Sequence, residues 1–134
     1  MSRLCVKTIL SELVACPSVN PRRLVPTDSP FGEERLQNLV AGWLSEWGAK
    51  TEMQSVTEGR CNLIARFRGL DSSRSLMLEV HADTVQADDM TIAPFEPQIR
   101  EGRLYGRGSC DDKGPMAAVL AAIKTVLDEE GMPP

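Results

Sequence analysis

The chain has 134 residues, of which 42% are hydrophobic and 25% are charged, as expected for one soluble globular domain. Its 15 basic and 19 acidic side chains give a net charge of −4 without a cluster of Lys and Arg, which argues against a nucleic-acid surface. No stretch approaches the roughly 18 apolar residues of a membrane span. A charged N-terminus argues against export, and four irregularly spaced cysteines are typical of reduced thiols. These features predict a cytoplasmic protein.

The first part of the chain contains two patterns typical of amphipathic helices. Apolar pairs recur every four residues over residues 3–15, until Pro17 ends the pattern. A proline-rich loop follows, and Ser29-Pro30 has the composition of a helix start, a capping serine before a first-turn proline. A second helix is therefore expected up to Gly48, with these apolar residues at helical spacing: Leu36, Leu39, Val40, Trp43, Leu44 and Trp47.

Several later segments are expected to be strands. Residues 50–56 and 61–68 are short candidates, and the second alternates apolar with polar side chains. Residues 76–80 are almost continuously apolar, which is typical of a strand covered on both faces in a parallel or mixed sheet. Residues 98–105 have the pattern of a hairpin that turns at Glu101-Gly102-Arg103.

The clearest element is a helix over residues 115–130, which Gly131 stops. Alanines widen its apolar stripe, which indicates a helix packed deeply against a sheet. Because helices and strands alternate along the chain, the sequence predicts an α/β fold. Three acidic residues are expected to form the solvated last turn of this helix, far from its amino end: Asp128, Glu129 and Glu130.

A histidine and an aspartate directly after residues 76–80 suit a metal site. His81 is the only histidine of the chain, and Asp83 lies two positions later. In an extended backbone both side chains point the same way. A carboxylate beside an imidazole fixes its tautomer, as around a metal-bound histidine. Taken alone, this pair also fits a surface or structural role.

A second candidate, Asp111, lies between a glycine-rich turn and the last helix, where the helix dipole favours a carboxylate. Asp111 or Asp112 could instead serve as the helix N-cap. A phosphate-binding loop is the other interpretation of Gly106 and Gly108. It fails because the third glycine of a dinucleotide motif and the Gly-Lys-Ser/Thr of a nucleotide loop are both missing.

Together, the two segments resemble the M20 family of zinc peptidases and deacylases, which includes acetylornithine deacetylase and succinyl-diaminopimelate desuccinylase. His81-Ala82-Asp83-Thr84-Val85 is similar to the family's His-x-Asp-x-Val. Residues 105–114 are close to its Tyr-Gly-Arg-Gly-x-x-Asp-x-Lys-Gly, whereas Val80 stands where the family usually has a small residue. The resemblance implies a three-layer α/β/α fold with a mixed, mostly parallel sheet. Residues 1–134 would be the N-terminal part of its catalytic domain, without the lid or dimerisation domain and the C-terminal part.

The resemblance also implies a chemistry. His81 would bind one zinc ion, Asp111 would bridge two zinc ions, and Asp83 would orient His81. Co²⁺ is expected to substitute for zinc. The family takes its glutamate base and remaining ligands from later segments, so this segment alone is expected to be inactive. The full-length protein is expected to hydrolyse an amide bond in N-acyl amino acids or small peptides. A homodimer is one oligomeric state that the resemblance allows for it.

Some alternatives stay open at this point. Zinc usually takes three or more protein ligands, and a single histidine cannot build a closed histidine-rich site. Cys110 is either a small turn residue or a ligand or redox-sensitive thiol, and Glu79 has no assigned role. Lys113 and Arg107 are expected to hold the turn, although Arg107 could also contact substrate. The alternative functions are a dipeptidase and a non-catalytic binding or assembly module that keeps the fold.

Overall fold

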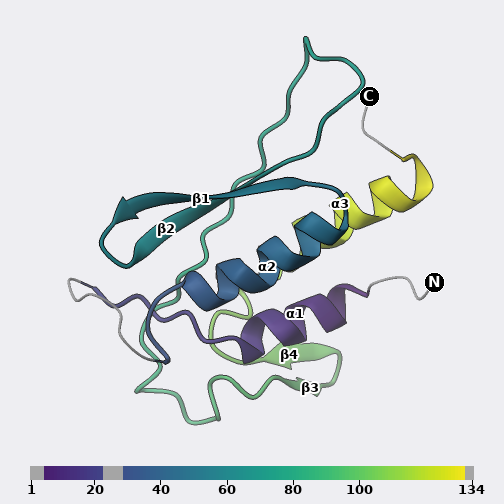
Figure 1. Ribbon diagram of the computed structural model, residues 1–134. Helices are drawn as coiled ribbons and strands as arrows, with labels where there is room; N and C mark the ends of the chain where they lie inside the picture. The colour runs from purple at the N-terminus through teal and green to yellow at the C-terminus, as the bar shows by residue number, and fades with distance from the viewer. Residues whose placement is uncertain (1–4, 23–28, 132–134) are drawn as a thin grey trace.

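The structure is a computed structural model that describes residues 5–22 and 29–131. Within these ranges it contains three helices and two antiparallel β-hairpins (Figure 1). No helix among them combines the length and apolar character that crossing a bilayer requires. The elements are α1 (Val6–Ala15), α2 (Glu34–Glu46), β1 (Lys50–Thr57), β2 (Arg60–Arg66), β3 (Gln98–Arg100), β4 (Arg103–Tyr105) and α3 (Lys113–Glu129).

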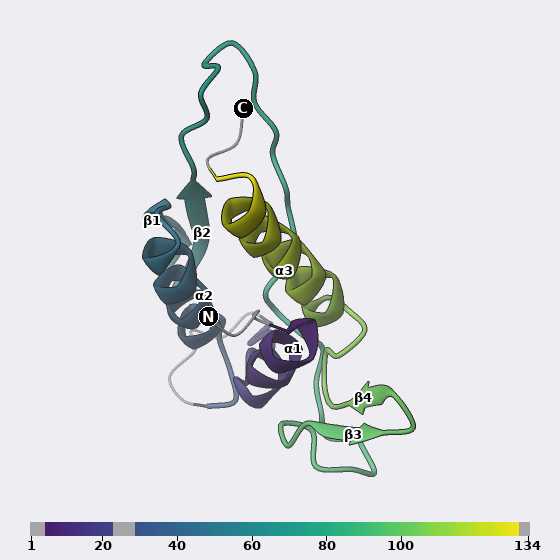
Figure 2. The same cartoon turned by 90° about the vertical axis from the view of Figure 1, so that its right-hand side faces the viewer.

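The hydrophobic core lies where the three helices meet. Figure 2 shows β2 between α2 on one side and α3 on the other, with α1 below them. One face of β2 packs on the core through Leu63 and Ala65, as the alternation in the sequence predicts. Burial of each large core side chain contributes roughly 1.5–3 kcal/mol. The buried core residues are Ile9, Leu13, Leu36, Val40, Leu44, Met116, Ala117 and Leu120.

The α/β fold class and most expected elements are confirmed. The hairpin of β3 and β4 pairs Gln98 with Tyr105 around the expected turn, and β1 pairs with β2. The mostly parallel sheet is not confirmed, because both sheets of the described residues are two-stranded and antiparallel. Parallel pairing occurs in isolated bridges, which join Val19 to Phe31 and to Thr84.

The strand expected at residues 76–80 is wrong for the described part of the chain. The backbone between β2 and Val80 runs out as a long loop beyond the helices (Figures 1 and 2). Leu76 and Met77 are 83% and 82% exposed. A strand exists only beside a partner that completes its hydrogen bonds, and no described segment forms backbone hydrogen bonds with residues 76–80, although Val80 packs against the core. An apolar run therefore predicts strand propensity but not its pairing.

The expected start of the second helix at Ser29-Pro30 is also wrong. The helix α2 begins at Glu34, and Glu33 occupies its N-cap position. The carbonyl of Pro30 accepts a hydrogen bond from the Val19 N–H at 2.9 Å, and Gly32 N–H donates to the Val19 carbonyl at 2.9 Å. These bonds hold the chain extended beside Val19, so helical backbone becomes possible only after Gly32.

Candidate metal centre

The two motifs meet in space, although thirty residues separate them in sequence. His81 Nε2 lies 2.9 Å from Asp111 Oδ1. Both side chains are open to solvent, with exposed fractions of 50% and 86%. Two ligands of one tetrahedral zinc ion stand about 3.4 Å apart, given bonds of 2.0–2.2 Å. If either side chain moved slightly outward, both atoms could therefore bind the same cation. An imidazole nitrogen and a carboxylate oxygen are donors that suit a divalent metal such as zinc.

The other ring nitrogen of His81 faces Asp83. His81 Nδ1 lies 2.9 Å from the Asp83 carbonyl oxygen and 3.3 Å from Asp83 Oδ1. Because both of these atoms are acceptors, Nδ1 carries a proton and donates. This leaves Nε2 as the ring atom available to a metal, with the Asp83 carboxylate behind it in the manner of a metal-bound histidine.

The charge around His81 is negative. The hydrogen bond to Asp111 raises the pKa of His81, against the effect of partial burial, and Asp83 and Asp112 add to the increase. The ring bridges Asp111 and Asp83. A metal that binds Nε2 would compete with a proton for the same atom.

Backbone pairing with residues 18–20 fixes the position of the first motif. Thr84 N–H donates to the Ser18 carbonyl at 2.9 Å, and Asn20 N–H donates to the Thr84 carbonyl at 2.8 Å. The Ser18 hydroxyl, which is fully buried, donates to the Ala82 carbonyl at 2.7 Å. These bonds hold residues 82–84 extended, which turns His81 and Asp83 to the same side.

A close approach of backbone to side chain fixes the second motif. Gly108 has a φ of +78°, and a Cβ atom there would lie 2.6 Å from Thr84 Cγ2. The Gly108 carbonyl accepts a hydrogen bond from Lys113 N–H at 3.0 Å. Glycine is therefore required at this position, both for its backbone conformation and for its contact with the first motif. The peptide bond between Asp111 and Asp112 is cis.

Neither aspartate caps the helix α3. Asp112 occupies the N-cap position, but its side chain makes no capping hydrogen bond. Its Oδ2 atom instead accepts a hydrogen bond from the His81 backbone N–H at 3.2 Å. Asp111 points to the His81 ring. The capping interpretation of these two residues is wrong, because both carboxylates turn to the first motif.

Two basic residues lie at the glycine-rich turn. Lys113 is completely buried, and its ammonium donates to the carbonyls of Leu13 and Cys16 at 2.9 and 2.8 Å. Burial lowers the pKa of Lys113 to about 8. A cation suits the carbonyl end of α1 because the helix dipole is negative there. Arg107 pairs with Asp89 at 3.2 Å. Lys113 thus holds the turn as expected, whereas Arg107 both pairs with Asp89 and lines the hollow beside the candidate metal centre.

A hollow of about 510 Å³ adjoins the facing side chains. Both motifs line it, together with Asn20, Arg22 and Gln86. Cys110 is exposed on its wall. Glu79 is exposed and makes no hydrogen bond or ion pair with the described residues. The hollow gives a small molecule access to the facing His81 and Asp111.

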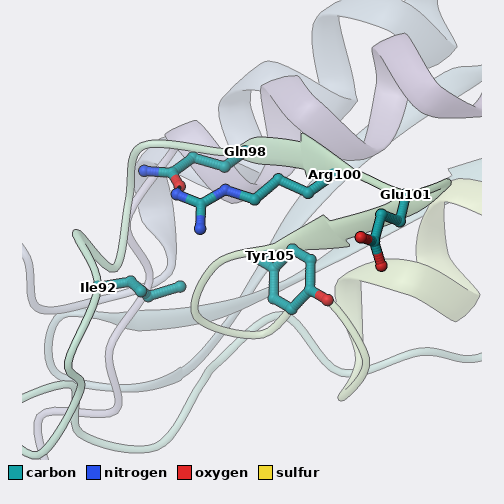
Figure 3. Close-up of a pocket in the computed structure, with 5 residues that line it drawn as sticks. All are labelled: Ile92, Gln98, Arg100, Glu101 and Tyr105. Atoms are coloured by element: carbon teal, nitrogen blue, oxygen red, sulfur yellow. Dashed lines mark hydrogen bonds between the residues drawn. The ribbon is translucent and has the colours of Figure 1, made fainter.

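A second hollow, of about 300 Å³, lies at the hairpin of β3 and β4 (Figure 3). The side chains of Arg100 and Gln98 hydrogen-bond to each other on one strand, while Tyr105 projects from the other. No residue of the His81 motif lines it, and Tyr105 is its one link to the second motif. The larger hollow is therefore the candidate functional site.

The described residues supply only part of a metal site. No group of three or more His, Cys, Asp and Glu side chains able to hold a metal occurs within residues 5–22 and 29–131. His81 and Asp111 are two donors, and zinc usually takes at least three from protein. Metal affinity of this chain alone is therefore expected to be weak.

Residues 18–20 are the part of the site that the sequence did not identify. They lie in the proline-rich loop after Pro17 and have no helical or strand periodicity. Their role depends on pairing with residues 82–84 across more than sixty positions, for which the local pattern contains no signal. The polar pair Ser18 and Asn20, flanked by Pro17 and Pro21, was the one available indication.

Comparison with known proteins identifies the class. Residues 77–134 match the sequence model of Peptidase family M20/M25/M40. The chain is 36% identical over 118 residues to an acetylornithine deacetylase of Edwardsiella ictaluri, which covers 85% of this chain and 30% of that protein. It is 34% identical over 125 residues to a succinyl-diaminopimelate desuccinylase of Rhodospirillum centenum, which covers 91% of this chain and 30% of that protein.

Solved structures agree with these matches. An M20 family metallo-carboxypeptidase of Sulfolobus solfataricus has a TM-score of 0.77 at 25% identity, over 93% of this chain and 28% of that one. Human carnosine dipeptidase 1 has a TM-score of 0.73 at 23% identity over the same shares, and shows the common fold. The assignment to the M20 family that the sequence predicts is confirmed by these matches. The chain spans about 30% of the length of the curated relatives named above.

Proposed function

We propose that this chain is the N-terminal part of the catalytic domain of a metal-dependent amide hydrolase. The observation that carries the proposal is the 2.9 Å separation between His81 Nε2 and Asp111 Oδ1, two donor atoms from motifs thirty residues apart. The relatives add support, since one is named a deacetylase, one a desuccinylase and one a metallo-carboxypeptidase. The substrate class that fits these names is an N-acyl amino acid or a small peptide.

The proposed roles are those that the resemblance to the M20 family implies. His81 and Asp111 would hold zinc, with Asp111 shared between two ions in the complete site, and Asp83 would orient the His81 ring. Bound zinc would polarise the amide carbonyl and lower the pKa of a bound water to near 7, and Co²⁺ would substitute for it. The described residues offer two donors, and the proposal takes the general base and the remaining ligands from later segments of a longer protein, as the family resemblance implies.

The proposal extends to the whole protein. Its lid or dimerisation domain and the rest of its catalytic domain lie outside residues 1–134. The whole protein acts in the cytoplasm, on small molecules rather than on nucleic acid or membranes, and homodimer formation is one of its assembly options. The competing function is a non-catalytic binding or assembly module that keeps the fold and part of the motif.

Zinc content and amide hydrolysis test the proposal directly. The purified 134-residue chain is titrated with Zn²⁺ and assayed with a panel of N-acyl amino acids and dipeptides, with Zn²⁺ or Co²⁺ added. We expect weak zinc binding and no turnover above the buffer background, because the general base is missing. Where the reading frame continues beyond Pro134, the longer product is expected to hydrolyse at least one substrate of the panel.

Three results would contradict parts of the proposal. Turnover by the 134-residue chain alone would show that no further residues are needed. Complete lack of zinc binding would remove the metal centre. A stop codon directly after Pro134 in the natural gene would favour the binding module over the hydrolase.

A further inference from the structure

We propose that Asn20 is a positioning residue of the metal centre, which acts on His81 through the carboxylate of Asp83. The inference rests on the proposed function, because it assigns Asn20 a part in preparing His81 for a metal. Asn20 Nδ2 donates to Asp83 Oδ2 at 2.6 Å. The other oxygen of that carboxylate, Oδ1, lies 3.3 Å from His81 Nδ1. One carboxylate thus joins the amide to the imidazole.

The orientation of the Asn20 amide follows from its second partner. Asn20 Oδ1 accepts a hydrogen bond from the Arg22 backbone N–H at 2.7 Å. A backbone N–H can only donate, so the amide oxygen must face Arg22 and the NH₂ group must face Asp83. Both ends of the side chain are engaged, and neither can turn without losing a hydrogen bond.

The backbone of Asn20 is also held by hydrogen bonds at both its N–H and its carbonyl group. Its N–H donates to the Thr84 carbonyl at 2.8 Å, and its carbonyl accepts from Gln86 Nε2 at 2.8 Å. The backbone of Asn20 is therefore tied to two residues that follow Asp83: Thr84 of the first motif and Gln86 just after it. This anchoring reduces the freedom of the amide, so it can hold the carboxylate in one rotamer rather than follow it.

The physical effect concerns the direction of Asp83. A carboxylate with 30% of its side chain exposed would otherwise rotate towards water. The amide of Asn20 occupies Oδ2 and so keeps Oδ1 turned to His81 Nδ1. The fixed acceptor at Nδ1 aims Nε2 at Asp111 and increases its basicity, which is the way outer residues support metal-bound histidines.

The test uses zinc affinity and the nuclear magnetic resonance signal of His81. Because the chain has one histidine, selective ¹⁵N-histidine labelling gives signals from His81 alone. In the Asn20→Ala variant we expect the zinc dissociation constant to rise about 10–100-fold. In the zinc-free variant we expect the His81 Nδ1–H signal to shift and broaden relative to that of the wild-type chain, because the Asp83 carboxylate is released while the Asp83 carbonyl, at 2.9 Å, still accepts from Nδ1. An unchanged zinc dissociation constant or an unchanged Nδ1–H signal would overturn the inference.

A matched control and a second variant separate positioning from general damage. Asn62→Ala removes an exposed asparagine of β2, whose amide donates to Gln54 at 3.4 Å, and is expected to change neither readout. Asn20→Asp keeps the shape and the acceptor for Arg22 but replaces the donor with a charge that repels Asp83. An added negative charge alone would tighten zinc binding, whereas lost positioning weakens it. Tighter binding by Asn20→Asp would overturn the inference.

The two measurements, zinc affinity and the His81 Nδ1–H signal, also tell a failure of this inference from a failure of the proposed function. If the wild-type chain binds no zinc, the metal centre fails, while the zinc-free Nδ1–H signal still decides whether Asn20 positions His81. If the wild-type chain binds zinc and Asn20→Ala binds it equally, the metal centre stands and the role of Asn20 is rejected. Circular dichroism of each variant checks that the helices are retained.

Discussion

Replacement of His81 by alanine is expected to weaken zinc binding by more than about 100-fold. The loss exceeds the 10–100-fold typical of residues that only support a ligand, because one of two available donors disappears. The free energy of unfolding should change little, since the ring is half exposed and lies outside the core. Competition with a chromophoric chelator measures the affinity, and thermal unfolding measures the stability.

The neighbouring thiol provides the control for this variant. Cys110 precedes Asp111, is exposed and lines the same hollow. We expect Cys110→Ser to retain zinc affinity and Asp111→Asn to lose it, because the carboxylate and not the thiol faces His81. If Cys110→Ser loses as much affinity as His81→Ala, the thiol is a ligand. If His81→Ala bound zinc with wild-type affinity, His81 would not be a ligand of the metal centre.

A methyl group at Gly108 is expected to lower the free energy of unfolding by about 2–4 kcal/mol. Two causes add: an alanine at a φ of +78° costs about 1 kcal/mol, and the new Cβ would lie 2.6 Å from Thr84 Cγ2. Relief of that overlap moves the turn away from the first motif, so zinc affinity should fall as well. Urea denaturation followed by circular dichroism measures the first effect.

Variants at Gly102 and Thr84 separate the backbone cost of the positive φ from the overlap with Thr84 Cγ2. Gly102 has a φ of +76°, and a Cβ atom there would meet no other atom within 4 Å, so Gly102→Ala measures the backbone cost alone. Thr84→Ser removes the methyl group that the new Cβ at Gly108 would meet. The double variant Gly108→Ala/Thr84→Ser should therefore recover part of the loss relative to Thr84→Ser. Equal destabilisation by Gly108→Ala and Gly102→Ala would show that the contact contributes nothing.

The helices could be predicted because their information is local. The stripe of α3 and the four-residue recurrence of α1 gave the helices observed, within a few residues, where the structure describes them. Strand segments were also recognisable, as in β2 and in the hairpin at Gly102. The pairing of residues 76–80 could not be predicted, because an apolar run does not specify which segment lies beside it.

The site was partly predictable for the same reason. His81, Asp83 and Asp111 were found because their spacing within each motif is local, and their convergence was a hypothesis that the 2.9 Å contact supports. Whether they bind metal stays a prediction. The contact of Asn20 with Asp83 spans 63 positions and depends on backbone pairing, which no local pattern encodes.

The buried ammonium of Lys113 makes the loop that carries Asp111 and the first helix parts of one cooperative unit. Lys113 stands two residues after Asp111 and donates to carbonyls at the end of α1. Fraying of that helix would release the ammonium and, with it, the loop. By thermodynamic linkage, a cation that binds the folded loop but not the unfolded chain would in turn protect the first helix, some hundred residues earlier in the sequence, from melting.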